Sequence, residues 1–372
     1  MRLKNVLADG QTAIRLGGDE FVVLAEERVT LGSMRLLAQA IIEAFNEAFS
    51  IRHYVFDFQV SVGVALCDNS YRQAEECLRD ADIAMYEAKQ QGRGNYQFFN
   101  NSMREREIAQ NQLEADLRQA IKAAQLRIEY APVLSTHSKQ LCSFEAIPSW
   151  HHPERGVLNI EELFVLAEDS GQVYDIGVWL FERICLQYAA WQTHLGNIQL
   201  PRIIVPVSGV QINVGGLVDH FSYIARQHDV KPDNVLLQLP EEALYNGSAA
   251  TLDNLKELQG HGFEVMISHF GSGHGALTHL HELPINQVKL EEDLLKQLID
   301  TDNSNLYEVT KATTTLCQNL KIGVIASGIN NAEQWLLAQR LNCSFIQGSY
   351  VDQPMRATEA TRYISDQKRQ AL

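Results

Sequence analysis

The sequence lacks any apolar run that approaches the roughly 18 residues of a membrane-spanning helix. Residues 1–10 also lack the hydrophobic core of a secretory signal. Low-complexity tracts are absent, and the 45% hydrophobic and 21% charged residues are typical of a globular protein that folds without a partner. We therefore expect no direct membrane insertion, and any membrane link would require a partner or additional sequence.

Cysteine is scarce, and no two cysteines form a CxxC pair, which argues against a zinc ribbon and a dense disulfide framework. We expect all six cysteines to be buried free thiols in a reducing compartment, and so predict a cytoplasmic protein. They are Cys67, Cys77, Cys142, Cys185, Cys317 and Cys343.

Basic residues are outnumbered and form no run. The 31 Lys and Arg residues face 46 Asp and Glu residues, which gives a formal net charge of -15. Such a chain repels a polyphosphate backbone unless its basic groups gather on one face. We expect no nucleic-acid partner.

A chain of 372 residues is long enough for two domains. Two β-runs over residues 12–24, joined by Gly17-Gly18, predict a hairpin. Helices over 31–45 and 74–91 and strands over 54–66 and 96–99 are expected to follow. A stretch rich in Glu, Gln, Arg and Ala predicts a linker helix over 101–124, between domains at 1–100 and 125–372.

Beyond the linker, strand-like apolar runs alternate mostly with helical patterns, which is the signature of a (β/α)8 barrel. Chemistry in such barrels lies where the strands end, and the polar residues expected there include few carboxylates. The predicted strands cover residues 126–134, 140–146, 202–207, 235–239, 264–267, 287–290, 321–326 and 345–346.

Two sets of motifs resemble known families. The sequence RLGGDEF at 15–21, followed by ADIAMYEAK at 81–89, resembles the GGDEF domain of diguanylate cyclases. From Leu126 onward the chain resembles an EAL domain, through FEAI at 144–147, HPERG at 152–156 and QG at 347–348. The resemblance implies a TIM-like α/β EAL barrel preceded by a truncated α+β GGDEF domain, and a role in bacterial cyclic di-GMP signalling.

By resemblance, active EAL enzymes hold two Mg²⁺ or Mn²⁺ ions that activate water to open cyclic di-GMP. Such hard cations require several oxygen ligands, mostly carboxylates. This chain keeps Glu145 of the name motif, but four formal negative charges of the ligand set are gone. The replaced positions are Pro206, Gln238, Ser268, His269 and Ser327. We expect no intact catalytic set and no metal cofactor.

The remaining residues of the resemblance could hold the nucleotide without metal. Lys289 and Gln347 match the family, Glu291 stands where an aspartate is usual, and Glu145 completes the expected ligand-binding group. Two other ligand positions are lost, because Ser149 replaces an arginine and Ala131 replaces a glutamine. The residues therefore leave cyclic di-GMP binding open.

The GGDEF remnant keeps Gly17 and Gly18 for close phosphate approach and Asp19 and Glu20 for metal, but only sixteen residues precede Gly17. About half of a cyclase domain, with its other metal-binding aspartate, is missing by resemblance. We expect no GTP cyclisation, and we expect unpaired strand edges. The shortened GGDEF domain has three interpretations: a truncated sequence, a late start codon or a relic of a complete domain.

Three functional hypotheses follow. The first is a non-catalytic regulatory protein that acts through a protein partner, through cyclic di-GMP, or both, with a homodimer through the barrel implied by resemblance. The second is a weak Mg²⁺- or Mn²⁺-dependent phosphodiesterase with a site rebuilt from Glu145, Gln238, Glu241 and His269. The third is a fragment without activity of its own.

Overall fold

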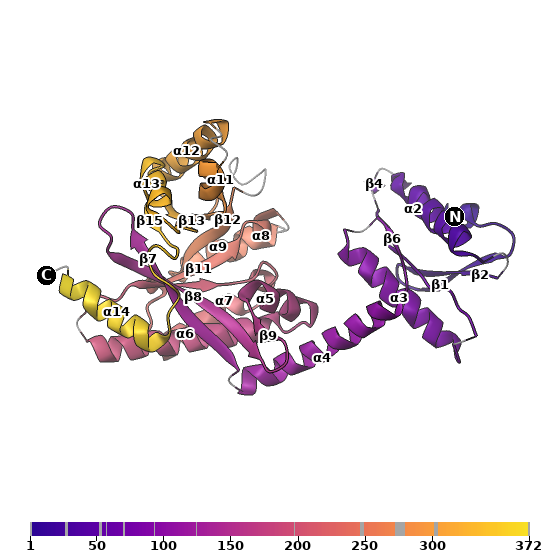
Figure 1. Ribbon diagram of the computed structural model, residues 1–372, viewed down its shortest axis with the longest axis horizontal. Helices are drawn as coiled ribbons and strands as arrows, with labels where there is room; N and C mark the ends of the chain where they lie inside the picture. The colour runs from indigo at the N-terminus through magenta and orange to yellow at the C-terminus, as the bar shows by residue number, and fades with distance from the viewer. Residues whose placement is uncertain are drawn as a thin grey trace. The chain divides into compact units, whose positions relative to one another are not determined.

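The computed structural model describes the chain except residues 1, 27–28, 52–53, 57, 70, 93, 124, 197, 246–248, 272–279, 301–303 and 371–372. The chain forms two compact units, Met1–Ala115 and Asp116–Leu372 (Figure 1). The division falls within helix α4 (Asn101–Ala123), which lies close to the predicted linker helix.

The first unit contains three separate two-stranded sheets among its described residues, two antiparallel and one parallel. The predicted hairpin is confirmed, and helix α2 begins at a capping box in which Thr30 and Ser33 bond each other's backbone. The elements are α1 (Arg2–Val6), β1 (Gln11–Gly17), β2 (Glu20–Ala25), α2 (Leu31–Asn46), β3 (Phe49–Ile51), β4 (Tyr54–Phe56), β5 (Val62–Val64), α3 (Ala74–Gln90), β6 (Tyr96–Phe98) and α4.

The single strand predicted over 54–66 is wrong. Strand β4 turns back on β3, whereas β5 pairs with β6 and packs on α3. A side chain at Gly63 would collide with the backbone of Ala81 and Met85, so this glycine permits the close approach of β5 to α3. Strands β1 and β2 pair only with each other in the described chain, and Leu16 and Phe21 on them are more than half exposed.

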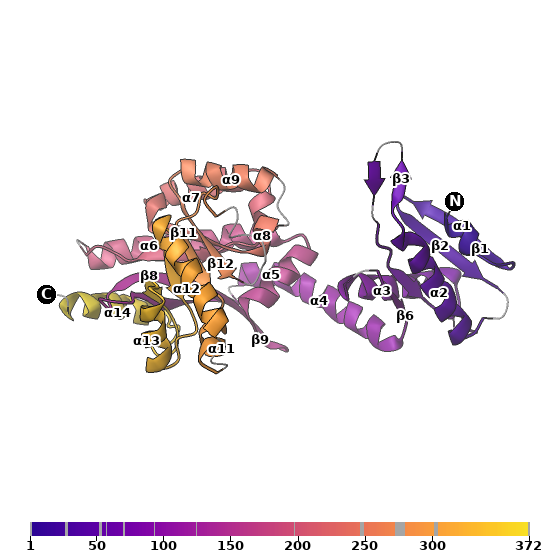
Figure 2. The same cartoon turned by 90° about the horizontal axis from the view of Figure 1, so that it is seen from above.

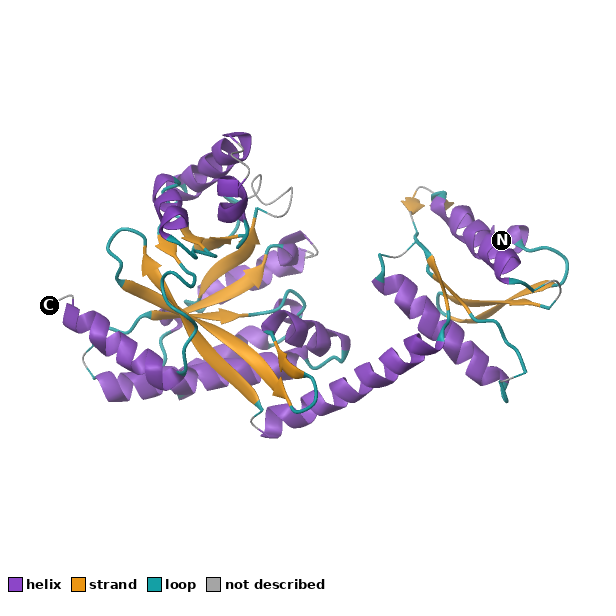
Figure 3. Cartoon of the chain, in the orientation of Figure 1, coloured by secondary structure: helices purple, strands orange, loops and turns teal. Residues whose placement is uncertain are grey.

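Eight strands of the second unit close into a barrel, in the order β7, β8, β10, β11, β12, β13, β14, β15 and back to β7 (Figure 3). All eight predicted runs are confirmed. The strands are β7 (Leu126–Ser135), β8 (Leu141–His152), β10 (Arg202–Pro206), β11 (Val235–Pro240), β12 (Glu264–Phe270), β13 (Gln287–Leu290), β14 (Gly323–Ala326) and β15 (Phe345–Ile346), with β9 (Gly156–Leu158) as an addition beside β8.

Helices cover the outside of the strands (Figure 2). Their apolar faces pack against the outer strand faces in one large core, which includes the stacked rings of Phe181 and Phe221 with centroids 4.1 Å apart. The helices are α5 (Ile160–Asp169), α6 (Val173–Leu195), η1 (Gln211–Asn213), α7 (Leu217–Gln227), η2 (Pro232–Asn234), α8 (Glu242–Tyr245), α9 (Ala249–Gly260), α11 (Leu294–Asp300), α12 (Ser304–Asn319), α13 (Ala332–Arg340) and α14 (Ala357–Gln370).

The barrel differs from an all-parallel TIM barrel because β7 runs antiparallel to both of its neighbours, β8 and β15. Strands β7 and β8, the first two of the barrel, form a long antiparallel hairpin, and β8 extends to His152. Glu145 therefore lies within β8 and not at its end. Its Cα partners are Ala131 on β7 and Ile204 on β10.

A second, smaller apolar cluster fills the inside of the barrel. We call it the floor layer, and it consists of Val133, Ile204, Leu236, Met266 and Ile325, with Phe345 packed against it. None of the five is more than 1% exposed. Because inward-facing residues recur every second position along a strand, the floor layer fixes which side chains lie above it toward the strand ends.

The prediction of six buried free thiols is wrong for Cys67 and Cys77, because the structure joins them in a disulfide, and for Cys142, which is only partly buried. Packing of β5 on α3 brings their Cα atoms to 5.9 Å, which the spacing in the sequence did not reveal. Cys142, Cys185, Cys317 and Cys343 are free thiols. Among the described residues, no helix is both long enough and apolar enough to cross a membrane.

Candidate functional site

A polar layer lies above the floor layer at the carboxyl ends of the parallel strands. Four of its members follow a floor residue by two positions: Pro206 follows Ile204, Gln238 follows Leu236, Ser268 follows Met266 and Ser327 follows Ile325. Glu145 joins them from β8, Lys289 from β13 and Gln347 from the residue after β15. We call these seven residues the mouth layer.

The single carboxylate of the mouth layer, Glu145, is held by its neighbours. The ammonium of Lys289 lies 2.9 Å from Oε1 and 2.7 Å from Oε2, so it bridges both oxygens. Nε2 of Gln347 donates to Oε2 at 2.5 Å, and the side chain of Gln238 bonds the same carboxylate. Residues from three other strands or strand ends therefore converge on this acid of β8.

This ion pair is largely withdrawn from water, because the side chain of Glu145 is only 10% exposed and that of Lys289 only 17%. Burial alone would raise the pKa of the Glu145 carboxyl. The positive charge of Lys289 and the hydrogen bonds outweigh it, so the pKa lies below its ordinary value. The formal charge of the mouth layer is therefore zero, with one carboxylate against one ammonium.

Gln238 carries an unused acceptor. Its Oε1 is shielded from solvent and has no hydrogen-bond partner among the described residues, although the same side chain bonds Glu145. A buried carbonyl oxygen without a donor costs free energy, on the order of 1–3 kcal/mol. An N–H donor of a bound molecule would satisfy it.

The two serines of the mouth layer are tied to the barrel wall. The hydroxyl of Ser268 donates to the carbonyl of Leu239 at 3.3 Å, and that of Ser327 donates to the carbonyl of Leu290 at 2.6 Å. Pro206 ends β10 with no polar side-chain atom. These three positions supply no charge for a cation.

In the described residues, Glu145, Glu241 and His269 of the predicted rebuilt metal site do not come together as a group of three that could hold a metal ion. Glu145 and Gln238 are in contact, but His269 Nδ1 lies 2.9 Å from Glu291 Oε2, and both of these side chains are more than a third exposed. Glu241 is buried, and its Oε2 accepts from the backbone N–H of Gly271 at 3.0 Å. Glu291, predicted to bind ligand, thus pairs with His269.

Within the described part of the chain, only one group of three His, Cys, Asp or Glu side chains is close enough together to hold a metal ion. It consists of Asp219, Glu257 and His261, all exposed on or beside helices α7 and α9. No member of this group belongs to the mouth layer. In the described residues, Glu145 therefore belongs to no group of three such side chains that could hold a metal ion.

The GGDEF remnant is an exposed turn. Gly17, Gly18, Asp19 and Glu20 are all exposed where β1 and β2 meet. The guanidinium of Arg15 donates to the carbonyl of Gly18 at 3.1 and 2.6 Å and so fastens the turn. Neither acid belongs to a cluster suited to a metal in the described residues.

Sequence reasoning did not foresee two features of the mouth layer. Lys289 was expected to contact a ligand, whereas in the structure it serves as counter-ion to Glu145. Gln238 was expected only as a weakened ligand, whereas it donates to Glu145 and retains an unpaired oxygen. The sequence showed only that the seven mouth-layer positions contain one acid, one lysine and otherwise neutral side chains.

Comparisons with protein families match the EAL domain over residues 114–354 and the diguanylate cyclase GGDEF domain over residues 1–95. The bifunctional diguanylate cyclase/cyclic di-GMP phosphodiesterase MucR of Pseudomonas aeruginosa is 31% identical over 94% of this chain and 50% of its own length. The cyclic di-GMP phosphodiesterase NbdA of the same organism is 27% identical over 95% of this chain and 45% of its own.

A solved structure described as the PaMucR phosphodiesterase in complex with c-di-GMP is also similar. Its TM-score is 0.62 at 28% identity, over 67% of this chain and 99% of that one. This chain spans about half the length of the curated relatives that it matches.

Proposed function

Because the chain belongs to the EAL domain family and carries a partial GGDEF domain before the barrel, we propose that it is a non-catalytic receptor for cyclic di-GMP. The observation that carries this proposal is the make-up of the mouth layer, in which Glu145 is the one carboxylate and already pairs with Lys289. The carboxylate that a metal would need is already neutralised by an ammonium ion of the protein.

The charge of the mouth layer argues against metal-dependent hydrolysis. Two divalent cations bring four positive charges, and a layer of zero formal charge offers nothing to offset them. A cation at Glu145 would also have to displace Lys289 from two contacts of 2.7 and 2.9 Å. The hydroxyls of Ser268 and Ser327, which are committed to backbone carbonyls, are poor substitutes for carboxylates.

The same layer suits a nucleotide bound without metal. The unpaired Oε1 of Gln238 is an acceptor for an N–H group of guanine, and Lys289 is a cation that a phosphodiester can share with Glu145. Gln347, which follows β15, donates to Glu145 on β8 and so joins these two parts of the mouth layer. The solved relative that is bound to c-di-GMP supports this choice of ligand.

A receptor must pass the binding of its ligand on to another molecule, and we propose that this molecule is a protein partner or a second copy of the barrel. A ligand shifts a partner's affinity only if it binds the two states of the receptor differently. The partial GGDEF domain, whose hairpin leaves Leu16 and Phe21 exposed, is a second surface available for such contact.

Calorimetric titration of the full chain with cyclic di-GMP tests the proposal. We expect micromolar binding that is equal in EDTA and in Mg²⁺, and about tenfold weaker binding in Gln238→Leu, because one buried hydrogen bond is lost. The matched control, Gln227→Leu at an exposed position of α7, should bind as the parent does. Binding that requires metal would contradict the proposal.

A phosphodiesterase is the rival function, and the names of the relatives MucR and NbdA favour it. A metal-dependent enzyme would convert the ligand to its linear form during the titration. Chromatography of the recovered ligand distinguishes the two functions.

A further inference from the structure

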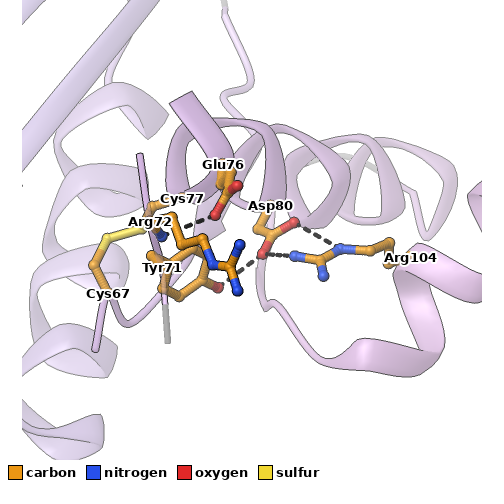
Figure 4. A network of polar contacts seen from close by, with 7 residues as sticks. All are labelled: Cys67, Tyr71, Arg72, Glu76, Cys77, Asp80 and Arg104. Atoms are coloured by element: carbon orange, nitrogen blue, oxygen red, sulfur yellow. Dashed lines mark hydrogen bonds and ion pairs between the residues drawn. A yellow bond between two sulfur atoms is a disulfide. The ribbon is translucent and has the colours of Figure 1, made fainter. Parts of the chain in front are cut away.

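A disulfide and the ion pair of the buried Asp80 with Arg104 lie next to each other in the first unit (Figure 4). Cys67 follows β5, and Cys77 lies in the first turn of α3, ten residues later. Cys67 is exposed, whereas Cys77 is only 7% exposed. The bond therefore closes a short loop between an exposed residue and a buried one.

The closed loop contains Tyr71, whose hydroxyl donates to Oδ2 of Asp80 at 2.8 Å. The Asp80 carboxylate is fully buried and pairs with the guanidinium of Arg104, whose Nε lies 3.2 Å from Oδ1. Arg104 belongs to α4, the helix that leads out of the first unit. A continuous chain of contacts thus runs from the disulfide loop to the start of α4.

The ionisation states of Tyr71 and Asp80 favour these contacts. Burial and the hydrogen bond to Asp80 raise the pKa of Tyr71 to about 12, so the hydroxyl stays protonated and keeps donating at neutral pH. Burial works to raise the pKa of Asp80, but the hydrogen bonds from Arg104 and Tyr71 hold it below its ordinary value. Asp80 therefore remains a carboxylate that depends on both donors.

We propose that Cys67 and Cys77 are a reversible redox modification site that controls how firmly the start of α4 is held. A thiolate of a small-molecule dithiol attacks Sγ of Cys67, the exposed residue of the pair, and Cys77 leaves as a thiolate that takes a proton. The second thiol of the reductant then attacks the mixed disulfide, which releases Cys67 and forms the reductant's own disulfide. Two electrons and two protons pass to the protein.

Reduction opens the loop that holds Tyr71 against Asp80. Without this loop closure, residues between Cys67 and Cys77 regain conformational freedom, and the hydrogen bond to Asp80 weakens. Among the described residues, Arg104 is then left as the side-chain donor to the Asp80 carboxylate. The site stands in the first unit and does not depend on the proposed binding of cyclic di-GMP.

Hydrogen exchange measured by mass spectrometry on the full chain tests the proposal, with the wild type compared before and after treatment with dithiothreitol. We expect amides in the first turns of α4 to exchange about tenfold faster after reduction, because a hydrogen bond to a charged group is worth roughly that factor. Reoxidation should restore the slow exchange.

Two variants separate the disulfide from the contact that it supports. Tyr71→Phe keeps both cysteines, so it should exchange fast at α4 in either redox state. Cys142→Ser removes a free thiol of the other unit, and it should respond to dithiothreitol as the wild type does. Equal exchange at α4 in the oxidised and reduced wild type would overturn the proposal, and so would failure of Cys67 and Cys77 to form a bond under mild oxidation.

Discussion

Replacing Lys289 with methionine leaves the Glu145 carboxylate without its counter-ion. Methionine fills a similar volume but supplies neither the charge nor the two donor contacts of 2.7 and 2.9 Å. Gln347 and Gln238 still donate to Glu145, but they carry no charge. Lys289→Met should therefore destabilise the barrel strongly.

The magnitude follows from the burial of the pair. Removing one partner of a buried ion pair costs about 3–5 kcal/mol, and the 10% and 17% exposure of these side chains places the loss near the lower end, at about 3 kcal/mol. For a domain of this size, each 1 kcal/mol lowers the melting temperature by about 2–4 °C, so a fall of about 6–12 °C is expected.

The effect of Lys289→Met should shrink in acid. In the parent protein the pKa of Glu145 is lowered, so its stabilisation is present above the unfolded value of about 4.3 and is lost as pH falls through the folded pKa. In the variant, burial without Lys289 raises that pKa, so the penalty applies at neutral pH and disappears once the carboxyl is protonated. The two proteins should converge as pH falls from 7 toward 4.

Tryptophan fluorescence during unfolding measures this loss in the barrel alone, because all four tryptophans lie in the second unit. Lys296→Met removes the same charge from an exposed position of α11 and should change stability by less than about 0.5 kcal/mol. The double variant Glu145→Gln, Lys289→Met should recover most of the loss. If Lys289→Met costs no more than Lys296→Met, the reasoning is refuted.

Three further predictions concern the barrel. Leu236→Ala removes part of the floor layer and should lower the free energy of unfolding in urea by about 2–5 kcal/mol. Leu336→Ala, at a side chain that is 52% exposed, should lower it little, and equal losses would contradict the packing described. Iodoacetamide at pH 8 should modify the partly buried Cys142 before the buried Cys185, Cys317 and Cys343. Burial raises the pKa of the three buried thiols to about 12, 11 and 12, respectively, and mass spectrometry of digested protein checks the order of modification. Millimolar Mg²⁺ or Mn²⁺ should leave the melting temperature of the barrel unchanged, since a cation bound at Glu145 would raise it.

The barrel strands could be predicted from the sequence because each apolar run is a complete signal in itself. Runs such as 202–207 and 264–267 are short, apolar and separated by helical patterns, and the structure places strands β10 and β12 there. The cap at Thr30 was equally local, because a capping box spans only four residues. The reversed direction of β7 was not predictable in this way, since the same apolar alternation serves strands of either direction.

The contacts that decide the chemistry lie far apart in sequence. Glu145 and Lys289 are separated by 144 positions, and only closure of the barrel brings their charged atoms together. Cys67 and Cys77 are close in sequence, but their bond depends on the packing of β5 against α3 at Gly63. The predicted loss of metal ligands, the choice of cyclic di-GMP and the cytoplasmic location stay predictions.

Incubation of the full chain with cyclic di-GMP and Mn²⁺, followed by chromatography of the nucleotide, tests the central claim most directly. The protein should be present at a concentration comparable with the ligand, so that even a few turnovers are visible. We predict that the ligand is recovered intact, while calorimetry on the same sample in EDTA shows it bound. Linear dinucleotide that accumulates with Mn²⁺ and not with EDTA would contradict the account, because it would show that the Glu145–Lys289 pair gives way to a working metal site.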